Sequence, residues 1–329
     1  MVSKKINEKS LNTNFRRDII IFLKEALSIP SVTGFTNSFT NFLINKFEEL
    51  NLKSYNVEDA LIIYSKKNSK KNCFCAHLDR IGFVKNKNHL EYSTLYYKQK
   101  DKSFNKDIKF LEKIKNRFIG EIIKSKENHK IKTGVIQNNK VLFSISTSLE
   151  DKFYTLSSKV NYDSYNISCQ LDNIISIAVL YIICKNKDFE GTLIFSKNEE
   201  IGQSFHGIIN SINKFKLDPK KIFVLDTTTQ VSNNNFEKGL ILINSKEKDA
   251  FYNKKLHQYI CKIAKENNIP YESDICKSTT ELYRIVKNSD NKYSGITIRI
   301  PRKNYHTSNE ETSFRCIENY FKLVSLIIK

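Results

Sequence analysis

The sequence predicts an α/β fold with three layers, in which helices cover both faces of a mixed sheet and a smaller, mainly β insertion interrupts the chain. Apolar runs with the character of strands alternate with helical patterns in both halves of the sequence. Such alternation is typical of a sheet covered on both faces. Between the halves, lysine-rich turns separate short β-like runs. We therefore expect one domain of residues 1–84 and 169–329, interrupted by an insertion of residues 85–168.

The first half begins with two amphipathic helices. Apolar residues recur at helical spacing in residues 15–27 and 37–50, and Pro30 and Gly34 separate the two patterns. Short apolar runs bounded by polar residues follow them. They predict strands at 60–64 and 72–76 and a further extended piece at 82–84.

The insertion and the second half are read with the same patterns. In the insertion we expect strands at 118–123, 133–136 and 141–145 and a short helix at 106–115. In the second half we expect helices at 172–185, 204–215, 249–267, 280–286 and 310–328, and strands at 192–195, 222–225, 240–243 and 295–300. Strands separated by helices in this way favour parallel or mixed pairing.

Length and composition limit the class of protein. With 329 residues, 40% of them hydrophobic, the chain is long enough for a substantial core. The most apolar run, residues 174–184, falls short of the roughly 20 residues of a membrane span and predicts a buried helix. The first 14 residues are polar, so we expect no secretory signal. The seven scattered cysteines then fit reduced thiols and a cytoplasmic location.

A formal net charge of +19 raises the question of an acidic partner. A basic surface for nucleic acid or an anionic membrane is one interpretation. However, the lysines are spread over the whole chain, and no arginine–aromatic cluster stands out among them. We therefore interpret the charge as solvated surface, and we expect neither nucleic acid nor a membrane as a partner.

Five short stretches each supply an acidic or imidazole side chain near the end of a predicted strand or the start of a predicted helix. They are AHLD at 76–79, LDN at 171–173, NEEIG at 198–202, LDT at 225–227 and YHTS at 305–308. Ligands of α/β sheets collect at the carboxyl ends of the strands. Two histidines and several carboxylates gathered there are what a pair of divalent metal ions requires, and such a pair activates water for hydrolysis.

Each histidine has a simpler explanation as well. His77 follows the strand at 72–76, and a neutral imidazole is a good zinc ligand. Asp79 lies two residues further on, so in an extended chain both side chains face the same way and the acid can fix the imidazole. A lone structural histidine is the alternative. His306 could likewise be an exposed loop residue.

The carboxylates are also ambiguous one at a time. Asp172 could bridge two metals or cap the helix that follows it, and Asp226 could bind a metal or its own turn. Glu199 and Glu200 could form a solvated acidic turn. Adjacent side chains diverge, however, so one could bind metal while the other accepts a proton as a general base. Their joint order and their positions at strand ends favour the metal site.

In this order, the motifs H-x-D-x-x-G-F, L-D, N-E-E-x-G, L-D-T and Y-H-T-S resemble those of the dinuclear metallo-aminopeptidases of the tetrahedral-aminopeptidase family. That family includes deblocking and glutamyl aminopeptidases. The resemblance extends from about Leu23 to Ile328. It implies a zinc-peptidase-like catalytic domain whose β-rich insertion serves assembly or acts as a lid.

The resemblance also implies roles for individual residues. Five would hold two divalent metal ions per subunit: His77 and Asp226 at one metal, Glu200 and His306 at the other, and Asp172 between both. Glu199 would be the general base, Asp79 would hold His77 for catalysis, and Glu281 would lie on the substrate side. Such ligands favour zinc, with cobalt or manganese as alternatives.

The chain departs from the family pattern at two of these places. Asn173 and Ile174 replace an aspartate and an arginine that usually follow the bridging aspartate, and Lys277-Ser278-Thr279 replaces a glycine-rich segment before Thr280. The resemblance still implies a cytoplasmic, homo-oligomeric hydrolase that removes N-terminal residues from peptides. A carboxypeptidase or deacylase of the related clan is the alternative, which a two-layer helix-and-sheet insertion would favour. An inactive basic binding protein is the third possibility.

Overall fold

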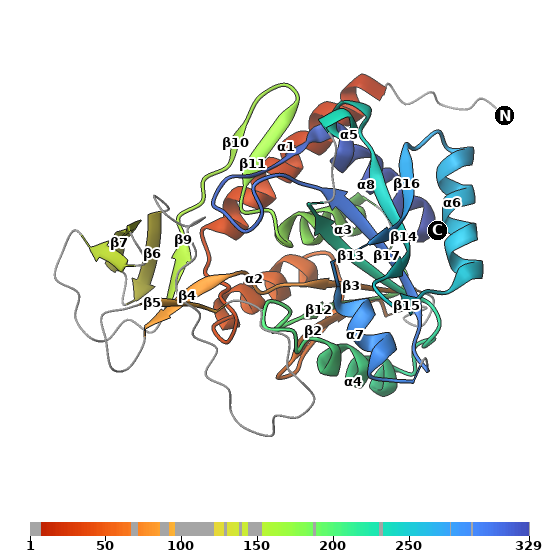
Figure 1. Cartoon of the computed structure of the whole chain (residues 1–329), viewed down its shortest axis with the longest axis horizontal. Helices are drawn as coiled ribbons and strands as arrows, with labels where there is room; N and C mark the ends of the chain where they lie inside the picture. Colours follow the sequence, from red (N-terminus) through yellow and green to blue (C-terminus); the bar gives the residue numbers. More distant parts are fainter. Residues whose placement is uncertain are drawn as a thin grey trace.

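The computed structural model describes residues 8–66, 72–85, 92–95, 122–127, 130–137, 140–143, 153–186, 189–229, 233–276, 278–290 and 292–328 (Figure 1). Its helices are α1 (Glu8–Leu27), α2 (Asn37–Glu48), α3 (Ile174–Asn186), α4 (Phe205–Phe215), α5 (Asn233–Lys238), α6 (Lys254–Glu266), α7 (Glu281–Lys287) and α8 (Phe314–Ile328). Its strands up to the end of the predicted insertion are β1 (Lys53–Asn56), β2 (Ala60–Tyr64), β3 (Cys73–His77), β4 (Gly82–Lys85), β5 (Tyr92–Leu95), β6 (Ile122–Glu127), β7 (Lys130–Gln137), β8 (Lys140–Phe143), β9 (Phe153–Leu156), β10 (Asn161–Tyr162) and β11 (Asn166–Cys169). The later strands are β12 (Thr192–Ser196), β13 (Ile222–Thr228), β14 (Ile241–Glu247), β15 (Ala250–Phe251), β16 (Tyr271–Cys276), β17 (Gly295–Pro301) and β18 (Glu310–Ser313).

A nine-stranded mixed sheet forms the centre of the molecule (Figure 1). Its order is β1-β2-β12-β3-β13-β17-β14-β15, and β16 pairs with β14. The four neighbours β12, β3, β13 and β17 run parallel to one another. The pairs β1–β2, β2–β12 and β14–β17 are antiparallel. Because the four central strands share one direction, their carboxyl ends meet at one edge of the sheet.

Helices cover both faces of this sheet. α1, α2, α3, α6 and α8 pack in one hydrophobic cluster with sheet residues such as Phe74 and Phe195. α4 and α7 pack in a second cluster, which contains Cys75 and Ile194. Successive residues of a strand point to opposite faces, so adjacent residues of β3 and β12 enter different clusters. The predicted three-layer α/β fold is confirmed.

The helix α3 determines where Asp172, one of the predicted site residues, lies. It is apolar on all sides, which is typical of a helix buried within a larger core. It packs against α1, α8 and the strands β3 and β13. Asp172 and Asn173 lie immediately before its first residue, joined by a cis peptide bond. Asn173 donates from its side-chain amide to the carbonyl oxygen of Leu225 at 2.7 Å, which ties this turn to β13.

A second sheet lies to one side of the central sheet and consists of five strands of the predicted insertion together with β4, which begins at Gly82, before the predicted insertion (Figure 1). Its order is β5-β4-β9-β6-β7-β8, with all neighbours antiparallel. Among the described residues between 85 and 168, the regular structure consists of strands. The predicted helix at 106–115 lies outside the described residues. β10 and β11 belong to a separate three-stranded sheet, in which β11 pairs with β10 on one side and with β18 on the other.

Two helices begin later in the structure than the sequence predicts. The helix predicted at 310–328 begins at Phe314, because Glu310–Ser313 pairs with β11 as β18 and the Ser313 hydroxyl accepts from the backbone N–H of Cys316 at 3.2 Å. The helix predicted at 249–267 begins at Lys254. Ala250–Phe251 forms a short hairpin strand with β14, and Asn253 caps α6 through its side chain.

Several elements that carry little apolar signal were not predicted, among them β1, β16 and α5. β1 reads KSYN, β16 reads YESDIC and α5 reads NNNFEK. β1 lies at an end of the central sheet and β16 has β14 as its partner in that sheet. Strands in such positions do not need two apolar faces, so alternation and apolar runs are weak guides to them.

The tight packing of the central strands gives a prediction for Gly295, the first residue of β17. A Cβ at this position would lie 1.9 Å from the carbonyl oxygen of Ile222, its partner on β13. We expect Gly295→Ala to lower the free energy of unfolding by about 3 kcal/mol, because the obstacle is backbone of a buried strand. Urea titration followed by circular dichroism measures this. Ser294→Ala, which adds no atom next to the same strand, is the control, and equal midpoints for the two variants would contradict the prediction.

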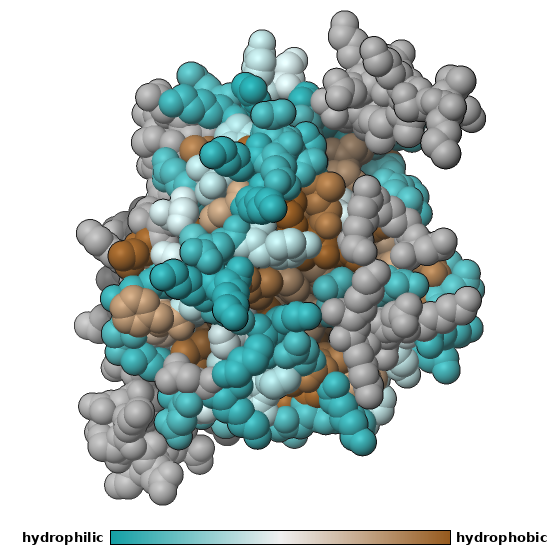
Figure 2. Space-filling view, turned by 90° about the vertical axis from the view of Figure 1, so that its right-hand side faces the viewer, coloured by the Kyte–Doolittle hydropathy of each residue, from teal (hydrophilic) through white to brown (hydrophobic). Residues whose placement is uncertain are grey.

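Hydrophilic side chains cover most of the face that carries α6, and hydrophobic residues gather mainly in a band near its middle (Figure 2). α6 itself turns Ile260 and Ala264 into the core, whereas Tyr259 is exposed. Among the described helices, none is both long enough and apolar enough to cross a membrane.

Candidate metal centre

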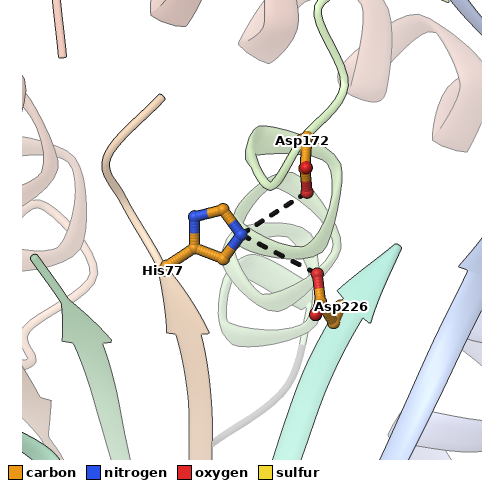
Figure 3. A group of neighbouring side chains, drawn as sticks. All are labelled: His77, Asp172 and Asp226. Atoms are coloured by element: carbon orange, nitrogen blue, oxygen red, sulfur yellow. Dashed lines mark ion pairs between the residues drawn. The ribbon is translucent and has the colours of Figure 1, made fainter. Parts of the chain in front are cut away.

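The predicted acidic and imidazole residues come together at the carboxyl edge of the four parallel strands. His77 is the last residue of β3, and Asp226 lies within β13. Glu199 and Glu200 follow β12, and His306 follows β17. Asp172 reaches the same place from the turn before α3 (Figure 3). The parallel register therefore gathers side chains that are far apart in sequence, as the strand-end argument predicts.

The first group of possible metal ligands contains His77, Asp172 and Asp226, drawn in Figure 3. The Nε2 atom of His77 lies 3.4 Å from Oδ1 of Asp172 and 3.7 Å from Oδ1 of Asp226. On the other side of the ring, Nδ1 lies 2.9 Å from the carbonyl oxygen of Asp79. A carbonyl can only accept, so Nδ1 carries a proton, and Nε2 is the ring atom that would bind a metal in the neutral imidazole.

The second group contains Asp172, Glu200 and His306. The Nε2 atom of His306 lies 3.0 Å from Oδ2 of Asp172 and 3.4 Å from Oε2 of Glu200. The other carboxylate oxygen of Glu200, Oε1, is buried and has no hydrogen-bond partner among the described residues. A buried carboxylate oxygen without a donor is costly unless a cation is bound to it. Asp172 belongs to both groups and turns a different oxygen to each.

Electrostatics of the site also fit divalent cations. Burial and the neighbouring Asp172 raise the pKa of Glu200 well above its usual value. Burial opposes a charge on His77, yet its contacts with Asp172 and Asp226 raise the pKa of this imidazole well above 6.5. The carboxylates thus crowd one another and recruit a proton onto histidine. Cations among them would favour ionised carboxylates and neutral imidazoles, the states that bind metal.

Asp79 connects several parts of the site. It is fully buried, and its Oδ2 accepts from the hydroxyl of Thr33 at 2.7 Å. Its two oxygens also accept from the backbone N–H groups of Glu199 and Glu200, at 3.0 and 3.2 Å. Its Oδ1 lies 3.7 Å from Nδ1 of His77. The His77 ring donates its hydrogen bond to the Asp79 backbone carbonyl, so the Asp79 carboxylate chiefly holds the Glu199–Glu200 turn.

Glu199 lies beside the candidate metal ligands without belonging to either group. Its Oε1 is 3.6 Å from Nη1 of Arg284, at the centre of α7. Burial raises the pKa of Glu199 to about 8, against the opposing effects of His77 and Arg284. Positive charge at the neighbouring ligands would lower this pKa towards the range in which a general base works.

Glu281 lies behind the site and does not line its cavity. It is 1% exposed at the start of α7, where the hydroxyl of Ser196 donates to its Oε1. Burial raises the pKa of Glu281 to about 7. Thr280, just before it, caps α7 and donates from its hydroxyl to Glu247. This contact network supports the floor of the site between β12 and α7.

Glu310 and Arg302, which hold the candidate ligand Asp172, were not predicted from the sequence. Glu310 is fully buried, and its Oε2 accepts from the backbone N–H groups of Leu171 and Asp172 at 2.7 and 2.9 Å. Its Oε1 accepts from the backbone N–H of His306 at 2.7 Å. Nη2 of Arg302 donates to Oδ2 of Asp172 at 2.6 Å. Burial alone would raise the pKa of Asp172, but Arg302 and the two histidines hold it well below its usual value.

The contact between Glu310 and His306 also explains the local backbone. His306 has a φ of 57°, in the left-handed region that a residue with a Cβ rarely adopts. Strained backbone of this kind persists at functional sites where surrounding contacts hold it. Here the Glu310 carboxylate, four residues later, binds the N–H of the strained residue. The spacing H-x-x-x-E was the signal in the sequence that could have identified it.

A cavity of about 310 Å³ opens beside both ligand groups. Its acidic side contains the proposed ligands and Glu199. The cavity is also lined by cationic side chains: Lys248, Arg284, Arg299 and Arg302. Arg299 is 1% exposed and pairs with Glu247, and its Nε has no hydrogen-bond partner among the described residues. The cavity therefore combines a ligand cluster with donors for an anionic group.

Comparisons with known proteins show which family and which solved structures this chain resembles. Residues 97–323 match the sequence model of the M42 glutamyl aminopeptidase family. A search of curated proteins gave no match. An aminopeptidase from the archaeon Desulfurococcus kamchatkensis has a similar structure, with a TM-score of 0.76 and 16% identity over 95% of each chain.

Two further solved structures show the same fold. The TET aminopeptidase of a marine-sediment Thaumarchaeota archaeon has a TM-score of 0.75 and 14% identity, covering 95% of this chain and 97% of its own. The TET1 peptidase of Pyrococcus horikoshii, which assembles into a tetrahedron or an octahedral shell, has a TM-score of 0.74 and 17% identity, covering 94% of this chain and 99% of its own. The family predicted from the motifs is thereby confirmed. The chain belongs to the M42 glutamyl aminopeptidase family and is a metal-dependent aminopeptidase.

Proposed function

We propose that this chain removes residues one at a time from the free N-termini of peptides, at a centre formed by His77, Asp172, Glu200, Asp226 and His306. The observation that carries the proposal is the pair of ligand groups that share Asp172. Each group supplies one imidazole and two carboxylates. Such donors suit zinc, which we propose as the native metal, with cobalt or manganese as substitutes.

Bound metals in this centre would supply an acidified water molecule and polarise the scissile carbonyl. Glu199 would accept the proton of the attacking water and return it to the leaving amine. Arg284 keeps the Glu199 side chain at 3.6 Å and limits its rotation. Asp79 fixes the backbone of Glu199 and Glu200 through two accepted hydrogen bonds. These contacts hold the base in one orientation beside the proposed ligands. A catalytic group that is already held in its working geometry accelerates the reaction.

The first test is metal dependence and the need for a free amine. Incubation with a chelator should abolish release of the N-terminal residue from short peptides, and zinc, cobalt or manganese should restore it. Acetylation of the peptide's amino terminus should abolish cleavage as well. Metal content is measured alongside activity. Equal cleavage of free and N-acetylated peptides would instead favour the carboxypeptidase or deacylase alternative.

We further propose that the cavity prefers an acidic N-terminal side chain, as the family description "glutamyl" suggests. Lys248 lines the cavity, and no ion pair joins it to a carboxylate within the described part of the chain. Arg299 lines the same cavity and adds a second positive charge. A substrate carboxylate would be attracted by both cations and would accept a charge-assisted hydrogen bond from Lys248, which is a strong kind of hydrogen bond.

Lys248→Met tests this preference. We expect kcat/KM for a glutamyl substrate to fall about tenfold while a leucyl substrate changes little, because a buried charged hydrogen bond is worth about 1.5–3 kcal/mol and this one is partly exposed. Lys246→Met, two residues earlier and within β14, is the matched control, since Lys246 does not line the cavity. A parallel fall for both substrates in Lys248→Met would contradict the preference.

Two broader features belong to the same proposal. The tetrahedral and octahedral shells of the Pyrococcus horikoshii relative support a homo-oligomer here. All seven cysteines are free thiols, and six are buried, which supports a reducing compartment such as the cytoplasm. Light scattering of the purified protein would test the first point.

A further inference from the structure

Arg302 holds an unusual position for a cation, because it lies within the ligand cluster of the proposed metal centre. It is 2% exposed and follows the last residue of β17. Its backbone N–H donates to the carbonyl oxygen of Thr228 at 2.7 Å, and its Nε donates to the hydroxyl of Thr227 at 2.6 Å. Its Nη1 pairs with Glu310. The guanidinium is thus held on three sides before it reaches Asp172.

The contact with Asp172 involves only one of the two carboxylate oxygens. Nη2 of Arg302 donates to Oδ2 at 2.6 Å, and this is the oxygen that lies 3.0 Å from Nε2 of His306. The other oxygen, Oδ1, faces Nε2 of His77 at 3.4 Å and accepts from the Thr227 hydroxyl at 2.8 Å. Oδ1, the Asp172 oxygen that faces the first ligand group, therefore accepts from a neutral hydroxyl. Oδ2, which faces the second group, is paired with a positively charged guanidinium.

This difference has an electrostatic consequence. A carboxylate oxygen has room for more than one partner, so Arg302 does not block a metal by volume alone. However, a guanidinium bound to Oδ2 draws off the negative charge that the second position would use, and it repels a divalent cation at short range in a buried site. The guanidinium also stays protonated at any working pH. The cost falls on the position next to His306 and Glu200.

We propose that Arg302 makes the two metal positions unequal, by competing with the second metal for Oδ2 of Asp172. The inference rests on the proposed ligand set. The position formed by His77, Asp172 and Asp226 fills first. The position formed by Asp172, Glu200 and His306 fills at higher metal concentration, and Arg302 sets that concentration. Arg302 is in this sense a positioning residue, which acts on the reaction through Asp172.

Cobalt titration of the metal-free protein tests the proposal without measuring activity. Visible absorption follows occupancy, and competition with a chromophoric chelator gives the two dissociation constants. Arg302→Gln removes the charge but keeps an amide donor for Asp172. We expect it to tighten the second constant by about 10- to 100-fold, the range over which outer contacts change metal affinity, and to leave the first nearly unchanged. The lower end corresponds to about 1.4 kcal/mol.

Arg284→Gln is the matched control. Arg284 is another largely buried guanidinium that lines the same cavity, but it contacts Glu199, which belongs to neither ligand group. It should leave both dissociation constants near those of the wild type. An unchanged or weaker second constant in Arg302→Gln would overturn the proposal, and so would equal tightening in both variants.

Arg302→Lys carries the test if the glutamine variant does not fold. Lysine cannot make the planar fork to Asp172 and Glu310 at once, so its hold on Oδ2 is weaker and the second constant should tighten by a smaller factor. An unchanged or weaker second constant would overturn the proposal here too. His77→Ala and His306→Ala separate the two levels of inference, since each should abolish one class of sites. If neither does, the ligand assignment itself fails.

Discussion

Glu199→Gln should leave the protein folded and loaded with metal but lower kcat by about 10²- to 10⁴-fold, the usual contribution of a positioned general base. Glutamine has nearly the same shape as glutamate, and Glu199 belongs to neither ligand group. The backbone N–H of residue 199 would still donate to Asp79. Only the ability of the side chain to take a proton is lost. Peptide hydrolysis and metal content, measured on the same sample, check both halves of the expectation.

The control for this prediction is Glu266→Gln, at the exposed end of α6, where the carboxylate pairs with Lys262 at 3.7 Å. It makes the same chemical change far from the cavity and should keep full activity. If Glu199→Gln retains near wild-type kcat, the base is another group. If it loses its metal as well as its activity, Glu199 is a ligand and the division between the two adjacent glutamates is wrong.

The elements that place the site were predictable because each carries a strong local signal. β2, at Ala60–Tyr64, was predicted with its observed bounds, and β3, β12, β13 and β17 were found within one to three residues. All of them are buried runs between polar segments. Strand order could not be read in the same way, since hydrophobic patterns do not specify which strands become neighbours.

The two wrongly predicted helix starts have a common physical cause. Glu310–Ser313 looked like the first turn of a helix because acidic residues are favoured there. Its pairing with β11, more than a hundred residues earlier, decides instead that it is a strand. Local preference is weak compared with a tertiary pairing that buries Glu310 completely. The hairpin of β14 and β15 overrode the predicted start of α6 in the same way.

The candidate site likewise contains some residues that the sequence predicts and others that depend on tertiary contacts. His77, Asp172, Glu200, Asp226 and His306 could be proposed because their order and strand-end positions resemble a known family. Arg302 could not, because nothing in P-R-K-N-Y-H states that its side chain turns inward to Asp172. Its direction depends on Thr227 and Glu310, contacts that exist only after β13, β17 and β18 have come together. The residues proposed to bind metal are thus easier to find in the sequence than the residues that orient them.

Asp172→Asn should have the most complete effect of any single substitution in the chain, because Asp172 alone takes part in both ligand groups. Oδ1 serves the group of His77 and Asp226, and Oδ2 serves the group of His306 and Glu200. The amide keeps the shape of the side chain but removes the charge that both metals would share. We therefore expect loss of both classes of metal and of all chelator-sensitive peptidase activity.

Asp226→Asn distinguishes a shared ligand from any acidic ligand. Asp226 belongs to one group only, so its amide variant should lose the first class of metal and keep the second. Inductively coupled plasma mass spectrometry after gel filtration gives the metal content of each variant, and circular dichroism verifies the fold. One tightly held metal in Asp172→Asn would mean that the carboxylate does not bridge.

Because Asp172→Asn also leaves Arg302 with Glu310 as its only carboxylate partner among the described residues, a lower melting temperature is expected for this variant but not for Asp226→Asn.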